Sequence, residues 1–287
     1  MHPVTVVRRV MLVGVLCLAT GITSADRSPS TTPAPSPGAN AVVVLVNASS
    51  PVDDLFVGQF CGGVLVAPDL VLTAAHCWRD DRRDGVDVVV GADNICKTAS
   101  ITGERRHVTS VLRHTPAQNG AVVDAALLVL NSPVTAQPIQ LPHPGDPDPT
   151  TGVALGWGRN GVYGAMPCTR QEVPLTFVTT SRCEKSQVNL GITPATGWEL
   201  CAVPDPTAKR NTCTGDSGSP VLTKHPPATM VGIVTWGPTC QRNDVGVYVR
   251  AAALANWIAE ESGSHPARMP PHVTERRPTP QSTPLHR

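Results

Sequence analysis

Short apolar runs constrain the fold of this chain more than any other feature. They are rich in valine and are separated by Gly, Pro, Asn and Asp, a pattern typical of the strands of an all-β sandwich or barrel. Eight such runs stand out: residues 41–46, 64–66, 86–90, 125–130, 152–155, 173–178, 230–236 and 245–249. Residues 131–150 contain six prolines and separate two similar groups of runs. The sequence therefore predicts two β-domains, over about 41–135 and 150–250, joined by a linker.

The two ends of the chain differ from this pattern. Residues 251–261 predict one helix, because Leu254, Trp257 and Ile258 fall on one face. Residues 26–40 are mostly Ser, Thr, Pro and Ala and predict a flexible leader. The Pro-rich tail, residues 263–287, lacks periodicity and is expected to be disordered.

The overall composition excludes several classes of protein. Of the 287 residues, 41% are hydrophobic and 3% are aromatic, and the net charge is +1. The apolar share is too high for a wholly disordered chain, and the balanced charge offers no basis for a nucleic-acid partner. We expect a core built mainly from aliphatic side chains.

The first 25 residues have the layout of a secretory signal peptide. Arg8 and Arg9 precede an apolar run over 10–22, and small residues follow up to Ala25. As a helix that run would span about 20 Å, short of the ~30 Å hydrocarbon core, which argues against a membrane anchor. The residues before Cys17 fit a lipidation signal poorly. We expect cleavage after Ala25, secretion, and no membrane contact thereafter.

Removal of the signal peptide leaves an even number of cysteines. Nine become eight: Cys61, Cys77, Cys96, Cys168, Cys183, Cys201, Cys213 and Cys240. An even number in an exported chain predicts four disulfides. A metal site is less well supported, because no two cysteines have CxxC spacing.

Three segments carry residues suited to nucleophilic catalysis. His76 lies in Thr-Ala-Ala-His-Cys after an apolar run, Asp124 begins another run, and Ser217 lies in Gly-Asp-Ser-Gly. An imidazole can take the proton of a serine hydroxyl, while a carboxylate holds the imidazole in the required tautomer. Each segment alone has a structural explanation: a packed histidine, a turn carboxylate or a polar loop. Together, in this order and 48 and 93 residues apart, they are far more specific.

On these motifs the chain resembles the chymotrypsin/trypsin family of serine proteases, from about residue 41 to 261. Further matching segments are Cys61-Gly-Gly63, Gly156-Trp157-Gly158, Thr235-Trp236-Gly237 and Gly246-Val247-Tyr248. The resemblance implies an all-β fold of two six-stranded antiparallel barrels with a C-terminal helix, and an active site in the cleft between the barrels.

The family's catalytic roles transfer to matching positions. His76 would be the general base and then acid, Asp124 would orient it, and Ser217 would attack the scissile carbonyl. The backbone N–H groups of Gly215 and Ser217 would form the oxyanion hole. The resemblance also implies the disulfides Cys61–Cys77, Cys183–Cys201 and Cys213–Cys240.

Cys96 and Cys168 remain after these three bridges are assigned. In this fold their loops flank the same side of the cleft, so we predict a fourth disulfide, Cys96–Cys168, that joins the two barrels. Two free thiols are the alternative, which an oxidising compartment disfavours.

The activation residues depart from the family pattern. In most animal members a cleavage frees an Ile-Val-Gly-Gly terminus, whose amine pairs with the carboxylate that corresponds to Asp216. No such segment occurs between residues 26 and 41. Because a buried unpaired carboxylate is costly, another cation must serve. The candidates are the amine of Asp26, the amine of Ser28 after cleavage at Arg27, and an internal cation.

The substrate pocket is expected to be neutral. Asn211 stands at the position of its base, Gly237 and Gly246 at its walls, and Thr235 and Trp236 beside them. An Asn cannot neutralise a buried cation, so we expect cleavage after large neutral residues rather than Arg or Lys. Asp244 could restore a basic preference if its carboxylate reached the pocket.

The sequence thus predicts a secreted serine endopeptidase that needs no cofactor and no metal. Ala92 replaces a carboxylate that calcium-binding relatives carry, so no structural calcium is expected. Protein or peptide substrates are the expected partners of a monomer, and protein protease inhibitors are candidate partners. The alternative is a catalytically inactive homologue that acts as a binding or regulatory module.

Overall fold

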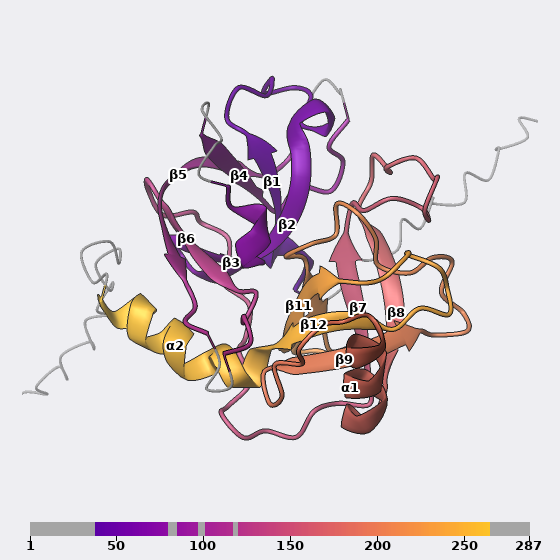
Figure 1. Ribbon diagram of the computed structural model, residues 1–287. Coiled ribbons are helices and arrows are strands. Elements are labelled where there is room, and N and C mark those ends of the chain that lie inside the picture. The colour runs from indigo at the N-terminus through magenta and orange to yellow at the C-terminus, as the bar shows by residue number, and fades with distance from the viewer. Residues whose placement is uncertain (1–37, 80–84, 97–100, 117–119, 265–287) are drawn as a thin grey trace, which may run out of the picture. The chain divides into compact units, whose positions relative to one another are not determined.

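A computed structural model describes residues 38–79, 85–96, 101–116 and 120–264 (Figure 1). The expected signal peptide, nearly all of the leader and almost all of the tail lie outside these residues. The last leader residues pack instead of remaining free. Residues Ala39–Ala41 form the 3-10 turn η1, in which Ala39 is buried and its carbonyl accepts a 2.9 Å hydrogen bond from Arg170.

Twelve strands form two closed six-stranded barrels in which all pairings between neighbouring strands are antiparallel. The first barrel has the strand order β1-β2-β3-β6-β5-β4. Its strands are β1 (Val42–Asn47), β2 (Gln59–Ala67), β3 (Leu70–Thr73), β4 (Val86–Val90), β5 (Glu104–Arg113) and β6 (Ala126–Leu130). The short turns η2 (Phe56–Gly58) and η3 (Ala75–Cys77) precede β2 and follow β3.

The second barrel has the order β10-β11-β12-β9-β8-β7. Its strands are β7 (Thr151–Gly156), β8 (Gln171–Phe177), β9 (Glu199–Pro204), β10 (Pro220–Leu222), β11 (Met230–Trp236) and β12 (Gly246–Arg250). In the described part of the chain, the α-helices are α1 (Thr180–Asn189) and α2 (Ala251–Ser264). The predicted fold class, two six-stranded antiparallel barrels with a C-terminal helix, is confirmed.

Helix α2 follows β12 without a break and lies beside the first barrel (Figure 1). Its buried Leu254 and Ile258 belong to the same apolar cluster as the first-barrel strands. The helix ends at Ser264, three residues later than predicted, so it includes the first residues assigned to the tail. No helix among the described residues is long and apolar enough to cross a membrane.

The runs named in the sequence analysis do not include strands β5, β9 and β10, and helix α1 was not expected either. Strand β5 is mostly exposed or half-buried and carries charged side chains, because it is held by pairing with β4 and β6 rather than by apolar burial. Helix α1 buries only Cys183 and Gln187, so it shows no apolar stripe. It begins where the Thr179 hydroxyl accepts a hydrogen bond from the Arg182 backbone N–H.

The two barrels are joined by a short strip of contacts beside the Cys96–Cys168 disulfide. Asn94 pairs with Thr169 in an isolated antiparallel bridge, and the Ile95 N–H donates to the Cys168 carbonyl at 2.8 Å. The disulfide closes this strip with a Cα–Cα distance of 5.0 Å. Loops from both barrels are therefore held together independently of the catalytic segments.

Candidate active site

His76 and Asp124 are brought together by two neighbouring strands of the first barrel. His76 lies in η3, just after β3, and Asp124 lies two residues before β6, with which β3 pairs. Asp124 Oδ2 lies 2.6 Å from His76 Nδ1, and Asp124 Oδ1 accepts from the His76 backbone N–H at 2.9 Å. The second contact fixes the carboxylate against the backbone that carries the imidazole, so both groups are held as a unit.

The environment of this pair alters the basicity of His76. The hydrogen bond to Asp124 raises the pKa of His76 above its usual value of 6.5, and burial opposes that rise only in part. About half of the imidazole side chain remains exposed, at 47%, so its outer edge is open to a ligand. The pair is therefore a base of increased strength at an accessible position.

Ser217 lies in the loop before β10, which we call the nucleophile loop (residues 213–219). The Gly62 N–H of β2 donates to the Ser217 carbonyl at 2.7 Å, so the first barrel holds this loop directly. Gly218 has φ +80°, and a Cβ there would lie 2.3 Å from the Gly62 carbonyl oxygen. Only glycine permits both this backbone conformation and this close approach.

Among the described residues, three backbone N–H groups of the nucleophile loop have no protein acceptor: those of Thr214, Gly215 and Ser217. Those of Asp216, Gly218 and Ser219 donate to the carbonyls of Cys213, Val234 and Asp216. Within the described part of the chain, the N–H groups of Gly215 and Ser217 have no protein acceptor. Gly215 has φ +97°, which again requires glycine. Such a pair of N–H groups is suited to stabilising an oxyanion.

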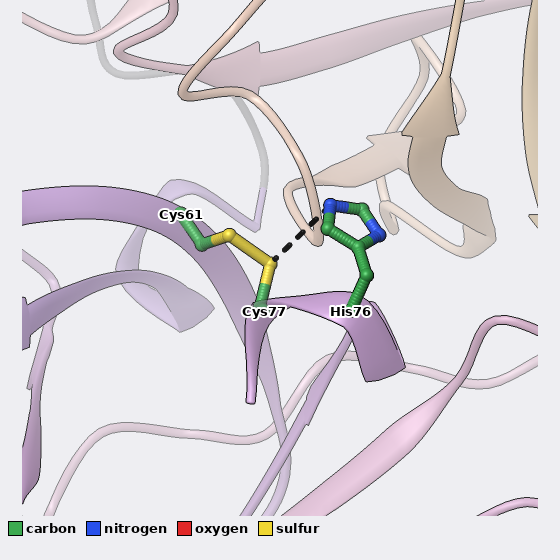
Figure 2. A group of neighbouring side chains, drawn as sticks. All are labelled: Cys61, His76 and Cys77. Atoms are coloured by element: carbon green, nitrogen blue, oxygen red, sulfur yellow. Dashed lines mark hydrogen bonds between the residues drawn. A yellow bond between two sulfur atoms is a disulfide. The ribbon is translucent and has the colours of Figure 1, made fainter. Parts of the chain in front are cut away.

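The His76 ring also lies against the Cys61–Cys77 disulfide (Figure 2). Its Nε2 is 3.9 Å from Cys77 Sγ, and no hydrogen bond joins it to Ser217 among the residues described. Catalytic hydrogen bonds often tighten only when substrate binds. Cys61, His76 and Cys77 form a group with metal-ligand atoms close together. However, the two sulfurs are bonded to each other and offer no thiolate to a metal.

A cavity of about 200 Å³ opens beside Ser217. Besides Ser217 it is lined by Thr212, Cys213, Thr214, Val234, Thr235, Trp236, Gly237 and Cys240, none of which carries a charge. Three of the five predicted pocket residues, Thr235, Trp236 and Gly237, are thus present in the lining. The Thr235 hydroxyl donates to the Val247 carbonyl at 2.8 Å, which orients the wall.

Asn211 and Gly246 lie outside that lining. The Asn211 amide donates to the carbonyls of Gln241 (2.9 Å) and Asp244 (3.2 Å), and its oxygen accepts from the Thr212 N–H. Both polar atoms of the Asn211 side chain are therefore hydrogen-bonded to the protein. Asn211 directly precedes Thr212 of the lining, and its place at the base of the pocket stays a prediction.

Asp244 is hydrogen-bonded to residues on both sides of Cys240, a residue of the cavity lining. Its Oδ2 accepts hydrogen bonds from the backbone N–H groups of Thr239 and Gln241, at 2.9 and 3.0 Å, and from the Thr239 hydroxyl. These bonds tie Oδ2 to the turn that precedes it, and Asp244 is not among the residues that line the cavity.

Comparison with known proteins identifies the family. The family model described as Trypsin matches residues 30–258, most of the chain. The chain belongs to the trypsin family. It is 31% identical to "Trypsin" of Saccharopolyspora erythraea, over 71% of this chain and 87% of that protein. It is also 31% identical to "Kallikrein-7" of Homo sapiens, over 71% of this chain and 78% of that protein.

Membership of the trypsin family makes this protein a serine-type endopeptidase, a hydrolase whose substrates are proteins. The resemblance seen in the sequence is therefore confirmed. The four disulfides of this trypsin-family chain join Cys61 to Cys77, Cys96 to Cys168, Cys183 to Cys201 and Cys213 to Cys240.

One residue of this site was missed in the sequence analysis. Arg210 is 6% exposed, and its guanidinium forms a bidentate pair with the Asp216 carboxylate, which is 1% exposed. Of the three candidate cations, the internal one is therefore present in this trypsin-family protease. A basic residue directly before the buried Asn211-Thr212-Cys213 segment was the available signal.

Proposed function

We propose that this protease cleaves peptide bonds through His76, Asp124 and Ser217 and a covalent acyl-enzyme. His76 accepts the Ser217 proton as Oγ attacks the scissile carbonyl, and then returns that proton to the leaving amine. Asp124 holds the Nδ1–H tautomer and stabilises the imidazolium. Gly215 and Ser217 donate their N–H groups to the oxyanion of the tetrahedral intermediate.

The double contact between His76 and Asp124 is the observation that carries this proposal. A carboxylate bonded to both the ring and the backbone of one histidine restricts its orientation more than a single contact would. The N–H groups of Gly215 and Ser217, which have no protein acceptor among the described residues, support the same chemistry from the loop before β10.

A fluorophosphonate probe, which reacts with activated serines, tests the proposal. We expect covalent labelling at Ser217, loss of labelling in Ser217→Ala, and strong reduction in His76→Ala. A folded wild-type protein that resists the probe would instead support the inactive homologue. Thr214→Ala is a matched control, because Thr214 lines the cavity but has no proposed proton-transfer role.

The uncharged cavity leads us to propose a neutral preference for the residue before the cleaved bond. A buried Arg or Lys would lose its hydration without gaining a counter-ion, which costs several kcal/mol. Both polar groups that could have met such a cation, Asn211 and Asp244, bond to the protein instead. Large neutral residues such as Leu, Met, Phe, Tyr or Gln avoid this cost.

Matched peptides that differ only at this residue test the preference. We expect kcat/KM for Phe or Leu to exceed that for Arg. A tenfold or greater advantage for Arg would contradict the neutral cavity, and Asp244→Ala would then show whether Asp244 supplies the missing charge.

We further propose that the protein is secreted, as a monomer, with protein protease inhibitors as partners. Four disulfides are consistent with an oxidising compartment. Expression with residues 1–25 intact, followed by terminal sequencing of the exported protein, tests secretion; we expect a terminus at Asp26. Size-exclusion chromatography tests the monomer, and titration with protein inhibitors tests the partners.

A further inference from the structure

Asp216 is the one carboxylate of the nucleophile loop, and both of its oxygens accept hydrogen bonds. Its Oδ1 accepts from the Gly158 N–H at 2.8 Å and from Arg210 Nη2 at 3.1 Å. Its Oδ2 accepts from the Cys213 N–H at 2.9 Å and from Arg210 Nη1. An ionised carboxylate has about four lone-pair positions. All four are occupied by donors from within the described chain, so no position is left for an additional amine.

The surroundings of this ion pair are shaped to fit it. A Cβ added to Gly156 would lie 2.4 Å from Asp216 Oδ1, and one added to Gly158 would lie 2.2 Å from Oδ2. Arg210 Nη1 also donates to the Asn211 carbonyl at 3.1 Å, which joins the pair to the segment beneath the cavity. Burying two charges is costly unless geometry and hydrogen bonds compensate. Here Nη1 and Nη2 of Arg210 are hydrogen-bonded, whereas its buried Nε has no partner among the described residues.

The pair is coupled to the proposed oxyanion donors by the chain itself. Asp216 lies between Gly215 and Ser217, whose N–H groups are the proposed oxyanion donors. Its own N–H and carbonyl are bonded to the Cys213 carbonyl and the Ser219 N–H, at 2.8 and 2.9 Å. If the carboxylate lost its partner, solvation would draw it outward, and the peptide groups on both sides would rotate with it.

We propose that Arg210 is a built-in positioning residue that sets the nucleophile loop, so that catalysis needs no newly formed chain terminus. This inference rests on the proposed function at Ser217. It assigns to a side chain of the loop region the role that the family resemblance gives to a terminal amine. The protease is then competent as soon as its barrels have folded, and N-terminal cleavage does not switch it on.

The first experiment asks whether activity requires a free N-terminus. The exported chain is prepared with a permanent N-terminal extension ahead of Asp26 and with Arg27→Gln to prevent cleavage, and its intact mass is checked. We expect the same fraction of fluorophosphonate-reactive sites and kcat within about twofold of the form that begins at Asp26. An extended form that is inactive until its terminus is freed would overturn the proposal.

The second experiment uses the chemistry of the cation. An arginine guanidinium remains protonated at pH values where a lysine amine, with an ordinary pKa near 10.4, loses its charge. We expect Arg210→Lys to retain activity near neutral pH and to show a new fall in kcat at alkaline pH. Asp216 and Tyr248 are the titratable groups described as interacting with Arg210, and burial raises the pKa of Tyr248.

Arg170→Lys is the matched control for this alkaline fall. Arg170 is also a buried arginine, with its side chain 10% exposed, but it contacts Ala39 and Asp93 rather than the nucleophile loop. We expect no new alkaline fall in kcat from this variant. The same alkaline profile in Arg210→Lys and the wild type would overturn the Arg210 proposal.

Arg210→Met removes the cation outright. We expect kcat to fall by about 10²-fold, as when an oxyanion donor is lost, with a smaller change in KM. Should this variant fail to fold, the alkaline profile of Arg210→Lys still decides the proposal. Wild-type protein that is not labelled by the fluorophosphonate would refute the proposed function itself; labelled wild type with unaffected Arg210 variants would refute only the role of Arg210.

Discussion

The imidazole and the backbone N–H of His76 bond to opposite oxygens of the Asp124 carboxylate, at 2.6 and 2.9 Å. This relationship constrains the histidine both at its ring and at its Cα. His76 follows β3 and Asp124 precedes β6, and these two strands are paired. The geometry of the two residues therefore depends on the register of β3 against β6. Two predictions depend on it.

The first concerns Asp124→Asn. The amide keeps the size of the carboxylate but can present an N–H to the ring and favour the wrong tautomer. We expect kcat to fall by about 10⁴-fold, the loss typical of such a change, while fluorophosphonate labelling slows in parallel. Thermal melting of the wild type and of Asp124→Asn checks that the variant is folded. A loss of less than tenfold in both measurements would argue against an orienting role for Asp124.

The second concerns pH. A general base must be neutral, and the hydrogen bond that His76 donates to Asp124 raises the pKa of His76 above 6.5. Activity should therefore decline on acidification at a midpoint above 6.5, since protonation removes the base. In Asp124→Asn the residual activity should decline at a lower pH. A pH profile of kcat/KM measures both midpoints, and an unchanged midpoint in the variant would contradict this assignment.

The third concerns Gly158. A Cβ at this residue would lie 2.2 Å from the Asp216 carboxylate. Gly158→Ala must therefore displace either the ion pair or the segment after β7 that contains residue 158. We expect the free energy of unfolding to fall by about 1–3 kcal/mol and the fraction of titratable active sites to fall with it. Gly263→Ala is the control, because a Cβ there meets nothing within 4 Å. Thermal melting and active-site titration would show whether the two variants behave alike.

The fourth concerns the disulfide between the barrels. Cys96 and Cys168 are 72 residues apart in the sequence, and replacing both by serine frees this loop in the unfolded chain. We expect a loss of about 2–5 kcal/mol in the free energy of unfolding. Activity below the new melting temperature should change little, since neither residue contacts His76 or Ser217. Denaturant titration measures the first effect, and kcat/KM at low temperature the second.

The fifth concerns Asn211→Asp, the change that would naively create a basic specificity. The amide of Asn211 donates to two carbonyls, and a carboxylate would face those oxygens without a proton to donate. We expect reduced stability and no tenfold gain in kcat/KM for Arg peptides. A stable variant that strongly prefers Arg would show that Asn211 can turn toward the cavity.

The sequence alone indicated an all-β fold, because short valine-rich runs such as 86–90 and 125–130, bounded by turn residues, favour strands. The arrangement in two six-stranded barrels came from the resemblance to the trypsin family. It also indicated the chemistry, since Gly-Asp-Ser-Gly combined with the segments around His76 and Asp124 is far more specific than each motif alone. Strand β5 and helix α1 were missed because pairing, a hydrogen-bonded cap and a disulfide hold them, and none of these leaves an apolar period.

Only the tertiary structure decided which side chain meets Asp216. Arg210 is six residues away in the sequence, yet no local pattern distinguishes a buried counter-ion from a solvated surface arginine. That distinction depends on Gly156 of β7 and Gly158 of the following loop, which leave room for the Asp216 carboxylate, and on the Asn211 carbonyl, which accepts a hydrogen bond from Arg210. The space left by these glycines is a consequence of packing between segments far apart in the chain, which a linear pattern does not record.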